Sequence, residues 1–447
     1  MQKARLSRQS FLEIALLATV VAGIFFAKLI VDSKGRILLT PGITLSGSGL
    51  TVHLPLQNNW RTLKEWQYER DNSFVLPAKL VERSIPIMDV YWKYDLNTTA
   101  ADSRQALEET VSRAGGRLYD TARTTVSCPM EYGRVIMPQN RIELYVGAAR
   151  LDFGRVLILQ VQSSPEDTSS AKAIFLTLAN SVRYEKPAEL TRGEELLQKL
   201  RQFETSVLFA DIPRQNLLAR DAGGGARGYE TAQFTVDTRG RVQIDKTMAF
   251  RTSAVIRRKE NLFESAHPFE TFDWRCQSDS VSSPSGIFSL RLKDDGVLTI
   301  EDPAGRTQTC RPGPVIVSQM LMDVFVRFFL EAEQQKTVLD VLYDDGRIIP
   351  AQISSIPLEQ AKAKAQEMAF AVRVESLNGA TTEFYFDADK KSLGKLTLEV
   401  NRQTLLWELT DQKDIEKYFH TPSARKGPMA ETKTENRVLS HEGNIRL

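Results

Sequence analysis

The feature that most constrains the fold is a series of short β-prone segments in the second half of the chain. Between residues 232 and 301 these segments alternate with turns such as Asp237-Thr238-Arg239-Gly240 and Asp294-Asp295-Gly296. The pattern resumes between residues 337 and 409. Successive strands at this spacing pair as hairpins. The sequence therefore predicts an antiparallel β domain over residues 229–420.

One apolar segment inside this region, Val315 to Leu330, has helical rather than strand periodicity. It follows Pro312-Gly313-Pro314, and its polar residues recur at four-residue steps, on one face of a helix. At 16 residues it is too short and too charged to span a membrane. We expect a long amphipathic helix over residues 315–333, packed on the sheet. The candidates on it to face an apolar ligand are Val315, Met320, Val324 and Phe328.

A second apolar run, Phe11 to Val31, follows a basic N-terminus. A spanning helix needs about 20 mostly apolar residues, and this run is long enough. A cleaved secretory signal is the alternative, although the bulky Phe25 before Ala27 disfavours cleavage. The positive N-terminal tail favours a cytoplasmic N-terminus. We expect residues 1–10 in the cytoplasm, a single-pass inner-membrane anchor at 11–31, and the bulk of the chain outside the cytoplasm, in the periplasm of a bacterial cell envelope.

Residues 37–186 are expected to form a small α+β domain. A hairpin pattern at its start ends at Leu54-Pro55-Leu56, with Trp60 following. A helix is predicted over Ala101 to Arg113, with Thr98 or Thr99 as its cap and a stop at Gly115-Gly116. The continuous apolar run Val156-Leu157-Ile158-Leu159 indicates a buried strand.

Two family resemblances bear on these regions. The order of elements in residues 37–186 resembles the PsbP-like α/β/α sandwiches, with Leu54-Pro55-Leu56 and Trp60 near the family's "LPxxW" segment and Val156 to Tyr184 near its closing strand, helix and short strand. That resemblance implies partner binding and no inherited active site. The layout of residues 229–420 resembles the curved-sheet periplasmic proteins of the LolA/LolB type, which implies that the sheet holds a lipid.

Together these segments predict an α+β protein: an N-terminal transmembrane helix, a small α/β sandwich, and a larger antiparallel β domain packed on a long apolar helix. A helical linker and a Gly-rich loop are expected at 187–228. The polar stretch 421–447 lacks apolar periodicity and is expected to be disordered.

Cysteine usage and charge limit the chemistry further. None of the three cysteines has the close spacing of a metal site. Cys276 and Cys310 are candidates for a disulfide if the domain is outside the cytoplasm, and two buried thiols are the alternative. With 58 basic against 56 acidic residues, the chain has no broad electrostatic attraction for phosphates, so nucleic acid is not an expected partner.

The short motifs do not indicate catalysis. Gly223, Gly225 and Gly228 match G-x-G-x-x-G, but a strand rather than a helix is expected after them, so a flexible loop is the better interpretation. The histidines and serines are too scattered for a catalytic triad. No catalytic, cofactor-binding or metal-binding residue is therefore predicted.

The predicted function is non-enzymatic. The first choice is a membrane-anchored binding or scaffold subunit of envelope machinery with a protein partner. Lipid or lipoprotein handling by the curved β domain is the first alternative. An unrecognised hydrolase is the second, and it requires a pocket in which a serine or carboxylate meets a histidine.

Overall fold

The structure is a computed structural model that describes residues 37–419 with internal gaps. The gaps are residues 57–58, 70–72, 83–84, 97, 99, 127, 138–141, 153, 164–167, 205–213, 240, 252–254, 265–269, 281–282, 364–366, 378 and 399–403. The predicted cytoplasmic tail (1–10), the predicted anchor (11–31) and the predicted disordered tail (421–447) lie outside the described residues.

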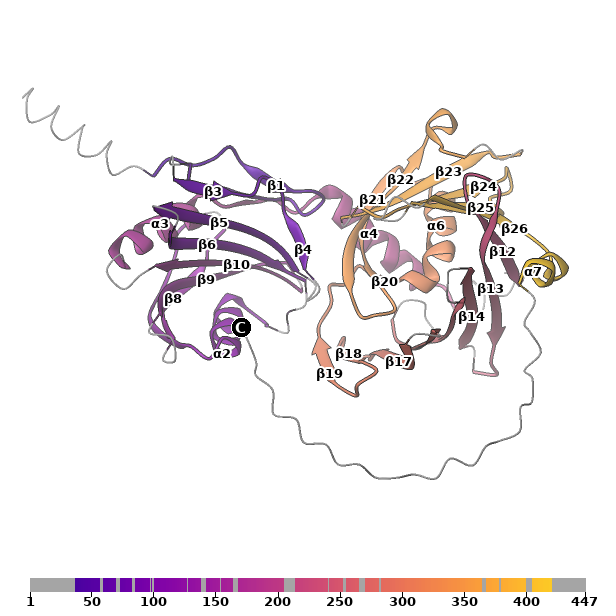
Figure 1. Cartoon of the computed structure of the whole chain (residues 1–447), viewed down its shortest axis with the longest axis horizontal. Coiled ribbons are helices and arrows are strands. Elements are labelled where there is room, and N and C mark those ends of the chain that lie inside the picture. Colours follow the sequence, from indigo (N-terminus) through magenta and orange to yellow (C-terminus); the bar gives the residue numbers. More distant parts are fainter. Residues whose placement is uncertain are drawn as a thin grey trace, which may run out of the picture. The chain divides into compact units, whose positions relative to one another are not determined.

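The first half contains an eight-stranded antiparallel sheet in the order β3-β5-β6-β10-β9-β8-β7, with β4 paired to β5 (Figure 1). Its strands are β3 (Trp60–Thr62), β4 (Gln67–Glu69), β5 (Ser73–Glu82), β6 (Ile85–Asp95), β7 (Arg117–Arg123), β8 (Glu131–Met137), β9 (Ile142–Asp152) and β10 (Arg155–Ser163). A separate three-stranded sheet joins β1 (Ile43–Leu45), β2 (Leu50–Val52) and β11 (Arg183–Tyr184).

Both faces of the eight-stranded sheet are covered. Helix α2 (Ser103–Arg113) packs with Val156 and Ile158 on one face. Helix α3 (Thr168–Ser181) and the small sheet pack with Leu157 and Leu159 on the other. Because successive side chains of a strand point to opposite faces, a strand buried on both sides has an unbroken apolar run, as β10 does.

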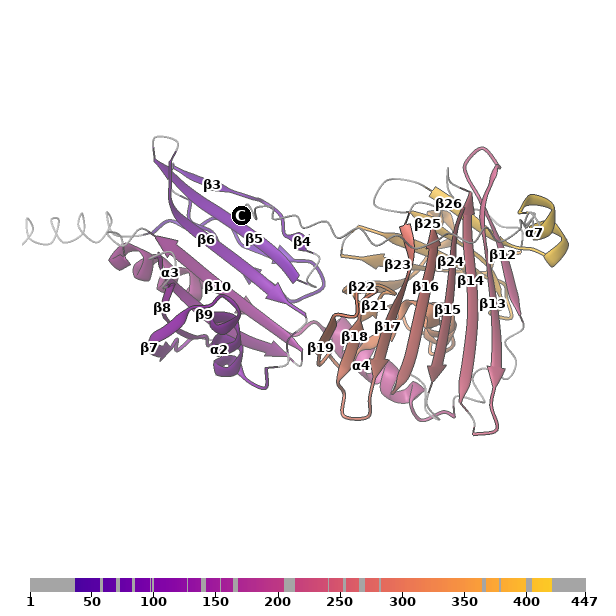
Figure 2. The same ribbon diagram turned by 60° about the horizontal axis from the view of Figure 1, so that its bottom comes forward.

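The second half contains a 15-stranded sheet in the order β19-β18-β17-β16-β15-β14-β13-β12-β26-β25-β24-β23-β22-β21-β20 (Figure 2). All neighbours are antiparallel except β20 and β21. The strands of its first half are β12 (Gln215–Arg220), β13 (Ala226–Val236), β14 (Val242–Arg251), β15 (Val255–Glu264), β16 (Phe272–Ser280), β17 (Ser283–Leu292), β18 (Leu298–Glu301) and β19 (Thr307–Cys310). Those of its second half are β20 (Ile316–Ser318), β21 (Lys336–Leu342), β22 (Ile348–Ile356), β23 (Phe370–Ser376), β24 (Thr381–Phe386), β25 (Ser392–Leu398) and β26 (Thr404–Leu409).

This sheet curls around helices α4 (Ala188–Leu200) and α6 (Met322–Glu331), which lie between its two halves in Figure 1. One hydrophobic cluster joins both halves to both helices: Trp274 and Leu290 come from one half, Ile353 and Phe384 from the other, and Phe325 from α6. The interior of the curl is therefore the core of this part of the chain.

The predicted long helix over residues 315–333 is wrong. Ile316–Ser318 is strand β20, Gln319–Leu321 is the 3₁₀ turn η2, and only Met322–Glu331 is α-helical. Three β-branched or extended-prone residues, Val315-Ile316-Val317, favour a strand, and the edge of β21 offers them parallel hydrogen bonds. The apolar segment thus serves two elements, and no long helix is packed under the sheet.

The predicted anchor, and the location that depended on it, are also corrected. Within the described residues, no helix combines the length and the apolar character that a membrane span requires. The predicted single-pass inner-membrane location with an extracytoplasmic bulk thus has no spanning helix behind it in the described part of the chain. The predicted fold class is wrong as a whole, because strands dominate, in three sheets, and neither of the two predicted long apolar helices is found in the described residues.

The stretch 187–228, expected to be a helical linker and a Gly-rich loop, contains helix α4, strand β12 and a hairpin turn. Helix α4 begins after Pro187, strand β12 pairs with β13 and β26, and Asp221 to Gly225 form the hairpin turn between β12 and β13. From Thr410 the chain is a separate unit, in which Asp411 caps helix α7 (Gln412–Tyr418) by accepting the Asp414 N–H at 2.8 Å.

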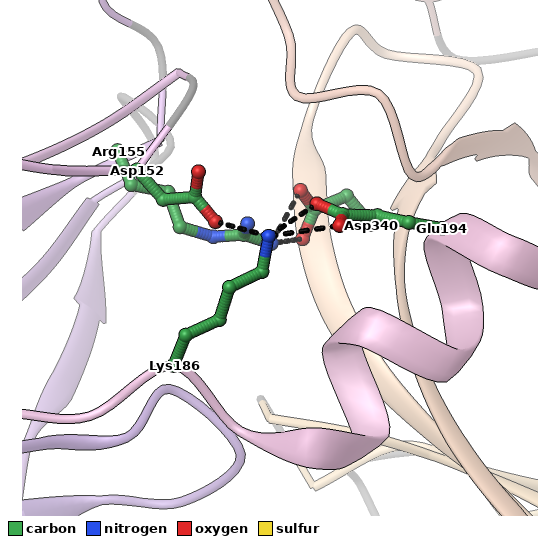
Figure 3. A network of polar contacts seen from close by, with 5 residues as sticks. All are labelled: Asp152, Arg155, Lys186, Glu194 and Asp340. Atoms are coloured by element: carbon green, nitrogen blue, oxygen red, sulfur yellow. Dashed lines mark hydrogen bonds and ion pairs between the residues drawn. The ribbon is translucent and has the colours of Figure 1, made fainter.

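A buried ion pair links strand β10 to strand β21, 185 residues apart in sequence. The Arg155 guanidinium donates to both Asp340 carboxylate oxygens at 2.9 and 2.8 Å, and Figure 3 shows the pair with its neighbours. Lys186 lies beside it, with its ammonium nitrogen 3.1 Å from an Asp152 oxygen and 2.8 Å from Glu194. Burial opposes the charge on Arg155, but attraction to Asp340 outweighs it and raises the pKa of the guanidinium.

Candidate functional site

The candidate site is a cavity of about 540 Å³ inside the curl of the 15-stranded sheet. Its walls come from strands of both halves and from the N-terminal end of α6. Ligand pockets in proteins usually measure about 300–1,000 Å³. The lining side chains are Glu230, Lys246, Met248, Phe250, Gln319, Met320, Met322, Asp323, Val341, Tyr343, Arg347, Val374, Ser376, Ala380, Thr381, Thr382, Phe384, Lys395, Thr397, Leu398 and Trp407.

Four charged side chains meet at one side of this cavity. Glu230 is 2% exposed, and its Oε1 lies 3.1 Å from the Lys246 Nζ. The Lys395 Nζ lies 3.1 Å from the Glu230 Oε2 and 3.7 Å from the Asp323 Oδ2. Burial alone would raise the pKa of Glu230, but the two ammonium groups lower it to about 2. The carboxylate is therefore ionised at any physiological pH.

The strand register explains how three of these groups reach the interior. Glu230 in β13 is opposite Met248, and Lys246 in β14 is opposite Ala232, so the carboxylate and the ammonium are diagonal neighbours on one face. Lys395 lies in β25, on the far side of β12 and β26. The curl of the sheet, together with the length of the lysine side chain, allows Lys395 to reach Glu230.

The aromatic wall of the cavity is built over two small residues. Phe250, Gly228, Ala219 and Trp407 lie opposite one another in turn across β14, β13, β12 and β26. The rings of Phe250 and Trp407 meet edge to face with centroids 5.8 Å apart. A Cβ at Gly228 would lie 2.7 Å from the Ala249 carbonyl oxygen and 3.0 Å from the Phe250 ring. A side chain at position 228 would therefore disturb this wall.

A hairpin turn and the strand after it account for the G-x-G-x-x-G match. Gly223 and Gly225 lie in the β12–β13 turn, where Asp221 Oδ1 accepts their N–H groups at 3.0 and 2.9 Å. The motif is thus a hairpin turn followed by a strand, and not the flexible interdomain loop expected. The short turn places β12 directly beside β13.

Further apolar side chains line the cavity, three of them methionines. Met248 comes from the sheet, and Met320 and Met322 come from the start of α6 and the turn before it. Val374 and Phe384 complete this surface. Methionine side chains are flexible and polarisable, and they adapt to apolar ligands of different shapes. The cavity therefore combines an apolar interior with a charged side.

A polar rim lies beside these walls. The Tyr343 hydroxyl and the Ser376 hydroxyl are 3.0 Å apart, and burial raises the pKa of Tyr343. The Arg347 guanidinium lies 5.7 Å from the centre of the Tyr343 ring and donates to Asp345 at 2.6 Å. Asp345 is not among the lining residues.

Of the four predicted ligand-facing residues, only Met320 lines the cavity. Val315 is buried in the core beside β21, and Val324 and Phe328 pack against the same core from α6. Phe328 also meets Phe203 edge to face. Because the segment changes from strand to 3₁₀ turn to helix, a single helical period could not assign its faces.

Of the two alternatives for Cys276 and Cys310, a disulfide or two buried thiols, the structure has the two buried thiols. Both residues are buried and neither takes part in a disulfide. They lie in β16 and β19, three strand steps apart, whereas a disulfide requires Cα atoms within about 7 Å. Cys276 Sγ instead lies 3.7 Å from an Asp344 carboxylate oxygen, and burial raises the pKa of Cys310 to about 12.

The buried charges were missed in the sequence. Glu230 and Lys246 occupy alternate positions in their strands with Gly228, Ala232, Met248 and Phe250, and a charge on the apolar side of an alternating strand is the signal that indicates them. Within the described residues, no group of three or more metal-ligating side chains is arranged to hold an ion. The lining of this cavity includes Ser376 but no histidine, so the serine–histidine pair named for a hydrolase is not found in this lining.

Comparison with known proteins identifies no family. No family model matches the sequence, and no curated protein matches it significantly. A solved structure described as a β-barrel-like protein of domain of unknown function DUF1849 from Brucella abortus aligns with 44% of this chain and 95% of its own length, at 10% identity and a TM-score of 0.34. A tail fiber of Staphylococcus aureus phage P68 aligns at 8% identity and a TM-score of 0.11. Likenesses this weak carry no argument, and the PsbP-like and LolA/LolB resemblances stay predictions.

Proposed function

We propose that the chain is a binding protein that holds an amphipathic small molecule inside the curl of its large sheet. The observation that carries the proposal is the cavity of about 540 Å³ between the two halves of that sheet. Met248, Phe250 and Trp407 offer apolar surface, while Glu230 and Lys395 offer buried charge on the same lining. A site of this composition fits a molecule with an apolar body and one polar end.

This proposal reverses the order of the functions expected from the sequence. A scaffold subunit is defined by a surface for a protein partner, and the sequence placed that function first. The strongest feature of the structure is an interior cavity, which favours the alternative of lipid or other amphiphile handling. Even a paired cluster of buried charges contributes little net stability, because desolvation offsets the attraction between the charges. Its position on the lining therefore favours a role in recognition.

The proposal is tested with the neutral dye N-phenyl-1-naphthylamine, whose fluorescence rises in an apolar site. We expect the full chain to bind the dye. Replacing Thr382, which lines the cavity from β24, by tryptophan fills part of the volume and should weaken binding at least tenfold. Solvent extraction of the purified chain followed by mass spectrometry should also recover a bound amphiphile.

The matched control is Thr307→Trp in β19, where the side chain is exposed and outside the cavity. It should bind the dye as the unmodified chain does. Absence of dye binding, or equal losses in the two tryptophan variants, would contradict the proposal.

A further inference from the structure

We propose that the ligand of this cavity carries an anionic head group, a carboxylate or a phosphate, which binds between Lys395 and the N-terminal end of α6. The inference rests on the proposed function and adds the chemical class of the ligand. It depends on the charge arrangement of the lining, not on the volume of the cavity.

The charged lining favours a negative ligand. Lys246, Lys395 and Arg347 are cationic, against the carboxylates of Glu230 and Asp323. The pKa of Glu230, lowered to about 2, shows that its charge is already stabilised by the two lysines. Arg347 shares its charge with Asp345 outside the lining, but it still presents a guanidinium to the cavity.

The N-terminal end of α6 adds positive potential at the same place. Gln319, Met320, Met322 and Asp323 all line the cavity, so the helix begins at its wall. Residue Leu321 precedes the helix and provides no side-chain cap. The Met322 N–H is bonded to the Gln319 carbonyl oxygen, and Asp323 is the acidic residue of the first turn. The helix dipole favours negative charge at this end, so a ligand anion that displaces Asp323 meets the same favourable potential. The helix end and the two lysines, each at least nine-tenths buried, come from different elements and converge.

The longest ion pair of the cluster marks where the head group binds. Lys395 Nζ is 3.7 Å from Asp323, compared with 3.1 Å from Glu230. Asp323 is also the most exposed of the four, at 27% of its side chain. A ligand anion can replace this weaker contact without leaving Glu230 unpaired in the interior. The Trp407 ring, 5.8 Å from the Lys395 Nζ, then lies beside the first atoms of the apolar body.

The experiment is displacement of bound N-phenyl-1-naphthylamine from the full chain by ten-carbon compounds that differ only in the head group. Decanoate and decyl phosphate are the anions, decyltrimethylammonium is the cation and 1-decanol is the neutral reference. Inorganic phosphate tests a head group without a tail. We expect at least one of the two anions to displace the dye at a tenfold lower concentration than 1-decanol.

The outcomes distinguish failure of the proposed binding function from failure of the proposed anionic head group. If the dye does not bind, the proposed function fails first. If the dye binds but 1-decanol or decyltrimethylammonium displaces it as well as both anions do, the anionic head group is excluded. Equal displacement by inorganic phosphate and decyl phosphate also overturns the inference, because the tail then contributes nothing. A preference for decanoate or for decyl phosphate identifies the head group.

Variants locate the head group. Lys395→Met, whose side chain is one atom shorter and uncharged, should weaken binding of the preferred anion at least tenfold more than it weakens binding of 1-decanol. If Lys395→Met does not fold, Arg347→Gln at the partly exposed rim provides the second test, with an expected loss of about threefold for the anion alone. Lys391→Met, at an exposed lysine outside the cavity, is the control and should change neither. Unchanged anion affinity in Lys395→Met would place the head group elsewhere.

Discussion

At the scale of single residues, Glu230 is the most informative position. A buried carboxylate is costly unless it is paired, and here two ammonium groups lie within 3.2 Å of its oxygens. The arrangement is asymmetric: removing Glu230 leaves two buried positive charges facing each other, whereas removing one lysine leaves the other as a partner. Glu230 is therefore the residue on which the electrostatic balance of the cavity depends.

Glu230→Gln should lower the free energy of unfolding at pH 7 by about 3 kcal/mol, because it leaves two buried ammonium groups without the carboxylate that pairs with them. The pKa of Glu230 is about 2 in the folded chain and ordinarily 4.5. A folded pKa below the unfolded one gives stability that is complete above about pH 4.5 and is lost as the pH falls toward 2. The difference between the variant and the unmodified chain, measured by urea denaturation, should therefore shrink from pH 5 to pH 2.5.

The control for this series is Asp389→Asn, in an exposed pair with Lys391, which should change stability little at any pH. A difference for Glu230→Gln that stays constant from pH 7 to pH 2.5 would show that the ionised carboxylate is not what stabilises the site.

At the scale of elements, close contact between helix α4 and strand β21 depends on a glycine. Gly193 lies in the middle of α4, where glycine is about 1 kcal/mol less favourable than alanine. A Cβ at this position would overlap the carbonyl oxygen of Val338 in β21. Hydrogen bonds flank the contact, from Thr337 Oγ1 to the Glu189 carbonyl at 3.1 Å and from Arg192 Nε to the Lys336 carbonyl at 3.0 Å. Packing therefore outweighs helix propensity here.

Gly193→Ala should destabilise the chain by about 2 kcal/mol, since a well-packed interior must shift to accept the added methyl group. Thermal and urea denaturation measure the change. Gln198→Ala, at an exposed position of the same helix, is the control and should stay within about 0.5 kcal/mol. A stabilisation of Gly193→Ala by the amount that helix propensity predicts would contradict the close contact.

At the scale of the whole molecule, the described residues up to Leu409 form one compact unit. The pair Arg155–Asp340 links strands of the two large sheets, and both side chains are less than 5% exposed. Attraction between two buried charges can fall short of their desolvation cost. The two residues therefore depend on each other, because either charge alone would be buried without a partner.

Asp340→Leu should destabilise the chain by about 3–5 kcal/mol, because it leaves Arg155 buried without a partner. The double variant Arg155→Met with Asp340→Leu removes both charges and should recover most of that loss. Urea denaturation of both single variants and the double variant gives the coupling free energy. Glu108→Ala, in an exposed pair with Arg104, should lose no more than about 0.5 kcal/mol. Additive single losses in the double variant would show that the two charges are not coupled.

Local chemistry made several elements of this chain predictable from the sequence. The helix predicted over Ala101 to Arg113 is observed as Ser103–Arg113, although its cap is Asp102, whose side chain accepts the Gln105 N–H. The run Val156-Leu157-Ile158-Leu159, predicted as a buried strand, lies within β10. Turns and alternation depend on neighbours in the chain, so a single sequence contains that information.

The candidate site could not be predicted from the sequence, because the tertiary structure brings its residues together. Alternation places Glu230 and Lys246 on one face, but the curl that brings Lys395 and the start of α6 to them follows from pairings between distant segments, such as β12 with β26. Another long-range pairing, with β21, makes Ile316–Ser318 a strand, although the spacing of apolar residues in this segment favours a helix. The sequence by itself determined hairpin strands such as β13 and β14 and the alternation of their faces, because these are local properties. Only the tertiary structure decided which inward faces enclose a cavity, because that depends on contacts between residues far apart in the chain.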